Sequence, residues 1–170
     1  WSEITQLSTQ DPSLATDTTS FQALLNTGDG LYRLDKNNKP QLSLATKAKT
    51  SNQGKTYDFY LRKNAKWSNG DPLTAKDFVY SYKRTVNPVT KSQMAFYLYQ
   101  IKNAQAISKG QKAPNTLGVS APSKYHLRIQ LTRPLPYFKI LLSWPLFFPQ
   151  NQKVVQKYGK LYGTQAKYTV

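Results

Sequence analysis

Two segments of the chain alternate strictly between hydrophobic and polar positions. In KTYDFYLRK the apolar residues fall at every second position, which predicts a half-buried strand. The segment 44–50 is expected to be its hairpin partner across an SNQG turn. KYHLRIQLT predicts a second strand of this kind, and LGVSA precedes it at hairpin distance. The side chains expected to face the core are Tyr57, Phe59, Leu61, Tyr125, Leu127, Ile129 and Leu131.

Other segments show helical spacing. Near the N-terminus Phe21, Leu24 and Leu25 predict a short helix, which the glycines of TGDG end. The strand LYRLD and a turn at 35–40 are expected next. The segment 93–109 is predicted to be one helix. Its apolar stripe contains Met94, Tyr97, Leu98, Ile101 and Ala104.

The C-terminal third holds the most apolar run, ILLSWPLFF. This run is too short to span a bilayer, and four prolines cut its surroundings into short pieces. We expect a buried crossing segment there. VVQKYGKLYG then predicts a short amphipathic helix with a glycine stop.

The most strongly specified stretch is KWSNGDPLTAKDFVYSYKR. Asn69-Gly70 predicts a turn, which Trp67 is expected to cover. Thr74 followed by Asp77 predicts a helix N-terminus with a capping box, and Asn87-Pro88 predicts its end. The expected apolar face is Ala75, Phe78, Val79, Tyr82 and Val86, with Lys76, Ser81, Lys83 and Arg84 facing water. This stretch is interpreted as a structural corner rather than an active site.

Composition narrows the function classes. The chain has 170 residues, 39% hydrophobic residues and twelve tyrosines, so it can bury a core. The tyrosines fit either a binding surface or half-buried positions on sheets. The net charge of +16 comes mostly from scattered lysines without a recognition motif, so a nucleic acid partner is not expected. A cationic surface protein that binds acidic polymers remains a possible alternative.

Catalytic sets are missing from the sequence. There is no cysteine, and the one histidine, His126, falls on the outward side of a predicted strand, where we expect it to be exposed. Gly54-Lys55-Thr56 lacks the glycine and the helix of a phosphate-binding loop and predicts a turn. We therefore expect neither an enzyme nor a bound metal or cofactor.

Taken together, several motifs resemble one protein family. YDFYLRKNAKWSNGDPLTAKDFVYSYKR, with DPSLATDTTSFQALLNTGDGLYRLD before it and LGVSAPSKYHLRIQLTRPLPYFKILLSWPLFFPQ after it, is similar to bacterial extracellular solute-binding proteins of the oligopeptide-binding kind. These are the receptor subunits of ABC peptide importers. The similarity runs from about Asp11 to Gly163. It implies that the chain binds oligopeptides without chemical conversion.

The resemblance also implies an architecture. Family members have a two-lobed fold of the periplasmic-binding-protein-like II type, of mixed α/β (α+β) class, and this chain corresponds to their N-terminal portion only. Residues 1–34 would be the first segment of lobe I, and 35–150 an additional small domain with antiparallel strands and helices. Residues 151–170 would return toward lobe I, and the second lobe would be absent. The corner at 66–84 would then lie remote from the ligand cleft.

Five positions are implied as ligand-binding residues. The segment Asp29, Gly30 and Leu31 matches the one expected to pair its backbone with an extended peptide. Asp29 stands where relatives usually have glutamate, which shortens the side chain. Tyr97 matches a tyrosine that lines the cleft. Trp144 matches a position that offers a ring to the ligand, although an ordinary core aromatic residue explains it equally well.

The resemblance further implies partners and a location. The expected partners are oligopeptides and the permease of the ABC transporter. The protein is expected outside the cytoplasm, in the periplasm or at the cell surface. There it would be held at the membrane by a lipidated N-terminus that this chain lacks. The alternative is a cationic adhesin fragment, for which the charge itself would be the functional feature.

Overall fold

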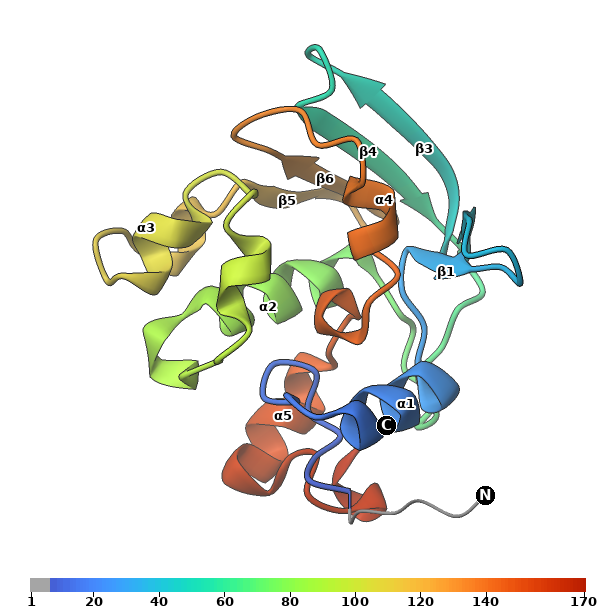
Figure 1. Cartoon of the computed structure of the whole chain (residues 1–170). Coiled ribbons are helices and arrows are strands. Elements are labelled where there is room, and N and C mark those ends of the chain that lie inside the picture. The colour runs from blue at the N-terminus through green and yellow to red at the C-terminus, as the bar shows by residue number, and fades with distance from the viewer. Residues whose placement is uncertain (1–6) are drawn as a thin grey trace.

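A four-stranded antiparallel sheet forms one layer of the fold, and helix α2 lies beneath it (Figure 1). The computed structural model describes residues 7–170. The strand order is β3 (Ala45–Ser51), β4 (Thr56–Leu61), β6 (His126–Gln130), β5 (Val119–Ser123). A separate small hairpin joins β1 (Tyr32–Leu34) to β2 (Pro40–Leu42). The predicted hairpins are therefore confirmed.

The alternation in β4 and β6 places one face of the sheet in the core. Tyr57 pairs with Ile129, and Phe59 with Leu127, so apolar side chains from both strands point to the same side. Phe59, Leu127 and Ile129 have no exposed surface. This face packs on α2 (Ala75–Val86), which supplies the fully buried Phe78 and Tyr82.

Helix α2 begins as its sequence predicts. The Asp77 carboxylate accepts hydrogen bonds from the Thr74 amide at 2.7 Å and from the Thr74 hydroxyl at 3.0 Å, which confirms the capping box. Burial raises the pKa of Asp77 against these hydrogen bonds. Trp67 lies at the Asn69-Gly70 turn, where its carbonyl accepts from the Gly70 amide.

The water-facing side predicted for α2 is wrong at two positions. Ser81 is fully buried, and its hydroxyl donates to the Phe148 carbonyl at 2.7 Å. The Arg84 side chain is only 15% exposed, and it pairs with both carboxylate oxygens of Asp11. Both corrections have one cause, because the N-terminal segment and residues 147–151 cover a face of α2 that a lone amphipathic helix would leave open.

The prediction of a single helix over 93–109 is also wrong. The structure has a short 3-10 turn, η2 (Ala95–Leu98), and a separate helix α3 (Ala104–Ser108). Between them Ile101 forms an antiparallel bridge with Leu131, and Asn103 has a φ of 67°, which a helix does not permit. The apolar stripe still marked the core, since Leu98, Ile101 and Ala104 are fully buried.

Short elements complete the chain. Helix α1 (Thr18–Thr27) ends at the C-cap Gly28, as predicted, and the Asp17 side chain is its N-cap. In the C-terminal third the prolines leave only short helices, which confirms the expected interruption. These are α4 (Phe138–Leu141), η4 (Pro145–Phe147), α5 (Gln152–Tyr158), η5 (Gly159–Leu161) and η6 (Ala166–Tyr168), while η1 (Pro88–Thr90) and η3 (Pro114–Thr116) lie earlier.

Candidate functional site

Four aromatic rings meet on the surface beside α1 and η2. Trp144 contacts Tyr97, with ring centroids 5.1 Å apart, and Phe21, at 6.0 Å. Phe96 lies against the other side of Tyr97 at 4.4 Å. We call this set, Phe21, Trp144, Tyr97 and Phe96, the ring row. The structure thus brings together two of the residues predicted to bind a ligand.

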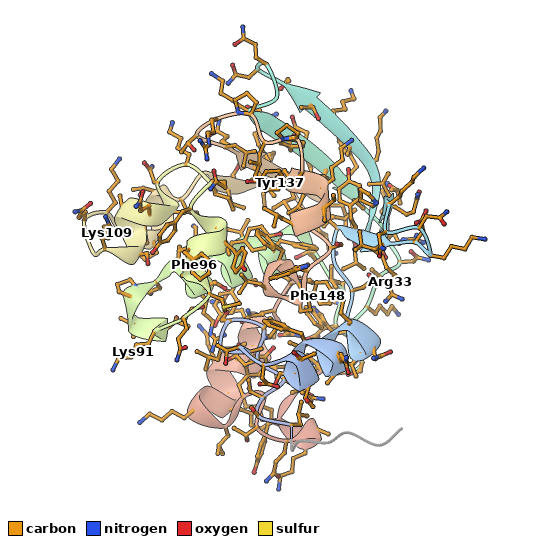
Figure 2. The ribbon with its side chains drawn as sticks, in the orientation of Figure 1. Arg33, Lys91, Phe96, Lys109, Tyr137 and Phe148 are labelled. Atoms are coloured by element: carbon orange, nitrogen blue, oxygen red, sulfur yellow. The ribbon has the colours of Figure 1, made fainter. Side chains whose placement is uncertain are left out.

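The ring row is open to solvent. Phe96 is 50% exposed and Trp144 is 36% exposed, while Phe21 and Tyr97 are half-buried. Figure 2 labels Phe96 at the surface below Tyr137, which is 51% exposed. The Tyr97 hydroxyl and the Trp144 indole N–H form no hydrogen bond within residues 7–170 and remain available as polar groups. Trp144 is therefore a surface residue, not the ordinary core aromatic that was the other interpretation.

Asp29 to Leu31 form the base of the β1–β2 hairpin. The Asp29 carboxylate accepts from the Gly30 amide at 3.0 Å and from the Ser43 hydroxyl, and Arg33 lies 3.4 Å away. Leu31 is fully buried in the core. The Gly30 and Leu31 carbonyls accept from the Leu44 and Ser43 amides. Both carboxylate oxygens of Asp29 therefore already have partners in this chain.

Close packing explains the glycine at position 30. A Cβ atom there would lie 2.8 Å from the Leu142 carbonyl oxygen and 2.9 Å from the Phe148 ring. Figure 2 labels Phe148, whose ring lies against Gly28 and Gly30. The glycine is required for the approach of two chain segments.

A groove of about 610 Å³ runs past Asp29 on one side of the molecule. Its walls include Gly28, Asp29, Trp67 and Phe148, together with Val170. Trp67, which belongs to the corner at 66–84, lines this groove together with Asp29. Of the five residues predicted to bind a ligand, only Asp29 lines this groove. Tyr97 and Trp144 belong to the ring row, Gly30 lies in neither place, and Leu31 is buried in the core.

One cluster of charged residues lies on the outer face of the sheet. Asp58 pairs with Arg128 at 2.8 Å and with His126 at 2.6 Å, and the imidazole stacks on Tyr60. Burial alone would raise the pKa of Asp58, but the hydrogen bonds and charges of Arg128 and His126 lower it below the ordinary value. The His126 side chain is only 17% exposed, so the prediction of a freely exposed histidine is wrong. Its partner across the sheet, 68 positions earlier, could not be seen in the sequence.

Residues 7–170 give no support for a metal site or a membrane-spanning helix. No group of three or more His, Cys, Asp or Glu residues there is placed to hold a metal ion. Within the same residues, no helix combines the length and apolar character needed to cross a membrane. Gly54 has a φ of 82° and lies in the turn between β3 and β4, which confirms that Gly54-Lys55-Thr56 is a hairpin turn.

Comparison with known protein families gives a match over most of the chain. The model described as "Bacterial extracellular solute-binding proteins, family 5 Middle" matches residues 39–170. The chain belongs to this family. The relatives are solute-binding proteins, which agrees with the expectation that the chain is not an enzyme.

Individual relatives, compared by sequence and by structure, support the same family. The chain is 44% identical to the dipeptide-binding protein of Lactococcus lactis over 98% of its own length, which is 30% of that relative. Over 91% of its length, the chain is 39% identical to the oligopeptide-binding protein OppA of Bacillus subtilis. This match covers 28% of OppA. The solved structure of Listeria monocytogenes OppA bound to peptide matches 98% of the chain with a TM-score of 0.96 and 36% identity, and the chain covers 33% of it.

These matches confirm the predicted family and fold class. The chain has the mixed α/β fold of part of an OppA-type binding protein. It spans about 30% of the length of these family members. Sequence reasoning missed Phe21 and Phe96 as members of the exposed surface. Phe21 had the spacing of a core residue on α1. Phe96 fell outside the apolar stripe predicted for 93–109, but nothing in the sequence indicated that it would contact Tyr97 beside Trp144.

Proposed function

We propose that this chain is the N-terminal part of an extracytoplasmic receptor that captures oligopeptides and delivers them to the permease of an ABC importer. The observation that carries the proposal is the match to a peptide-bound OppA over 98% of the chain with a TM-score of 0.96. The solved structure of the pheromone receptor PrgZ, which was described together with its mode of peptide binding, also matches at 43% identity. The proposal extends the ligand class of these relatives to this chain.

The surface of the chain suits binding without chemistry. The ring row offers apolar area, and its free hydroxyl and indole N–H can bond to a peptide backbone. Specificity in such a site comes from where the ligand's own side chains fall. Residues 1–34 and 151–170 would belong to the ligand-binding lobe, and residues 35–150 to the additional domain. A second lobe, supplied by further chain, would close the other side of the peptide.

The proposal includes a location and a route to the membrane. The family is described as extracellular, which fits a receptor working outside the cytoplasm. By resemblance, the protein would be attached to the membrane through a lipidated N-terminal segment. The net charge of +16 would favour residence near an anionic envelope.

Calorimetry with a pooled peptide library tests this function. The natural full-length protein is expected to bind peptides, whereas the 170-residue chain alone binds them poorly, because only one wall of the cleft is present. A titration at rising salt serves as the control for non-specific attraction. Capture through backbone hydrogen bonds and rings should change little with salt, while binding that collapses with salt would indicate a charge-driven adhesin instead.

A further inference from the structure

We propose that the outer face of the four-stranded sheet docks on the headgroups of an anionic phospholipid membrane. The outer face consists of the side chains on β3, β4 and β6 that point away from α2, which are Lys47, Lys49, Asp58, Tyr60, His126 and Arg128. The inference rests on the proposed function only for its location, since it needs a receptor that works outside the cytoplasm.

The strand register brings these side chains together. Phe59 and its partner Leu127 are fully buried on the α2 side of the sheet, so the residues next to them along each strand point outward. One outward row is Lys49, Asp58 and Arg128, and the other is Lys47, Tyr60 and His126. Neighbouring strands lie about 4.8 Å apart, so the two rows spread their charges over a flat area rather than along one line.

The acidic group of the outer face is already paired. The Asp58 carboxylate is 13% exposed and contacts the Arg128 guanidinium at 2.8 Å and the His126 imidazole at 2.6 Å. Lys47 and Lys49 are exposed, and neither forms an ion pair within residues 7–170. Arg128 is 44% exposed, and its terminal amino groups have no partner in the same part of the chain. The outer face therefore presents cations without a free carboxylate beside them.

The charge continues past the edge of the sheet. Strand β3 is an edge strand, and the β1–β2 hairpin lies beside it (Figure 1). The turn of this hairpin adds the exposed Lys36 and Lys39, which form no ion pair within the described residues. The nearby Asp35 carboxylate accepts from the Asn37 and Lys39 amides of the turn. Unpaired cations thus extend from the outer face onto the neighbouring hairpin.

The outer face suits a membrane surface better than a linear acidic polymer. The phosphates of an anionic leaflet form a plane, and lysines near that plane are attracted to it. A single polymer chain is held better by a groove, and none of the outer-face residues lines the groove at Asp29. Within residues 7–170, none of the exposed large hydrophobic side chains belongs to this face. The contact is therefore electrostatic and does not insert into the bilayer.

The experiment measures vesicle binding by the natural full-length protein in an unlipidated form. Sedimentation gives its affinity for vesicles of phosphatidylglycerol mixed with phosphatidylcholine, and for vesicles of phosphatidylcholine alone. The test variants are Lys47→Gln with Lys49→Gln, and the charge-conserving pair Lys47→Arg with Lys49→Arg. The matched control is Lys91→Gln with Lys109→Gln, which removes the same charge from exposed lysines that Figure 2 labels on the side of the molecule away from Arg33. Thermal melts establish that each variant is folded.

The wild type should bind the mixed vesicles and not those of phosphatidylcholine alone. The glutamine pair at 47 and 49 should weaken binding by about tenfold or more, because each lysine at an anionic membrane surface contributes about fivefold. The arginine pair should retain the affinity, and the control pair should lose less than about threefold. Peptide affinity should stay unchanged in all variants, since none of these residues lines the groove at Asp29 or belongs to the ring row.

Several results would overturn the docking surface. A wild type that does not bind the mixed vesicles removes it, and an equal loss for both glutamine pairs would assign the attraction to total charge. Binding of soluble polyphosphate through Lys47 and Lys49, without vesicle binding, would make the partner an acidic polymer. Aggregation of the glutamine pair at 47 and 49 with unchanged vesicle affinity would mean that these lysines only keep the edge strand from pairing with other chains. All of these results leave the proposed function intact, which fails only if the wild type binds no peptide.

Discussion

Replacing Arg84 with methionine should destabilise the fold strongly. The Arg84 guanidinium donates to both oxygens of Asp11, at 2.7 and 2.6 Å, and to the Gln150 side chain at 2.8 Å. Asp11 is only 1% exposed. The pair thus ties the N-terminal segment and residue 150 to α2, which carries Arg84. Burial would lower the pKa of Arg84, but the hydrogen bonds and charge of Asp11 raise it overall.

The magnitude follows from what remains after the substitution. Methionine fills a similar volume but leaves the Asp11 carboxylate buried, with the Ser13 amide at 2.9 Å as its remaining strong donor. Removing one partner of a buried ion pair costs about 3–5 kcal/mol. At about 2–4 °C per kcal/mol for a domain of this size, the melting temperature should fall by about 10 °C.

Urea unfolding followed by circular dichroism measures this loss. Asp11→Asn and the double variant complete a double-mutant cycle, in which we expect a coupling energy of about 2 kcal/mol or more. Lys153→Ala is the control, because its contact with Asp71 at 3.6 Å is exposed and should be worth less than about 1 kcal/mol. A loss below about 1 kcal/mol for Arg84→Met, or additive single effects, would refute the reasoning.

Three further predictions concern stability and can be measured by the same unfolding assay. Gly30→Ala should cost about 1–3 kcal/mol, since the new Cβ would lie 2.8 Å from the Leu142 carbonyl oxygen; a neutral effect would contradict this packing. Tyr82→Phe should cost about 1–2 kcal/mol, because the buried hydroxyl donates to a carbonyl at 3.0 Å, and an unchanged urea midpoint would argue against that bond. Asp17→Ala should cost about 1 kcal/mol at neutral pH by uncapping α1. The backbone hydrogen bond from Ser20 lowers the pKa of Asp17. The contribution of this cap is therefore present above the ordinary aspartate pKa and is lost as the pH falls through the lowered value; a pH-independent difference would contradict this assignment.

The sheet could be predicted from sequence because its signal is local. Alternation in β4 and β6 identified Phe59, Leu127 and Ile129 as core residues, and all three have no exposed surface. The start of α2 was equally clear, since a capping box needs only Thr74 and Asp77 at the right spacing. Alternation within one strand and helix caps depend on residues that are close along the chain, whereas the pairing of β4 with β6 joins distant segments.

The predictions that were wrong all concern residues whose partners lie far along the chain. Arg84 looked like a surface cation because Asp11 lies 73 positions away. The helix expected over 93–109 was interrupted by the bridge between Ile101 and Leu131, which no local pattern reveals. The ring row is a meeting of three distant segments, so its extension to Phe21 and Phe96 appears only in the folded chain.

Equilibrium capture of peptides tests the central claim most directly. The natural full-length protein would be incubated with a pooled library of two- to eight-residue peptides, separated from free peptide by rapid gel filtration, and its bound fraction identified by mass spectrometry. The account predicts that peptides are retained at about one per protein molecule, with varied sequences and with little change at high salt. A protein that retains no peptide under these conditions would contradict the assignment of this chain to a peptide receptor.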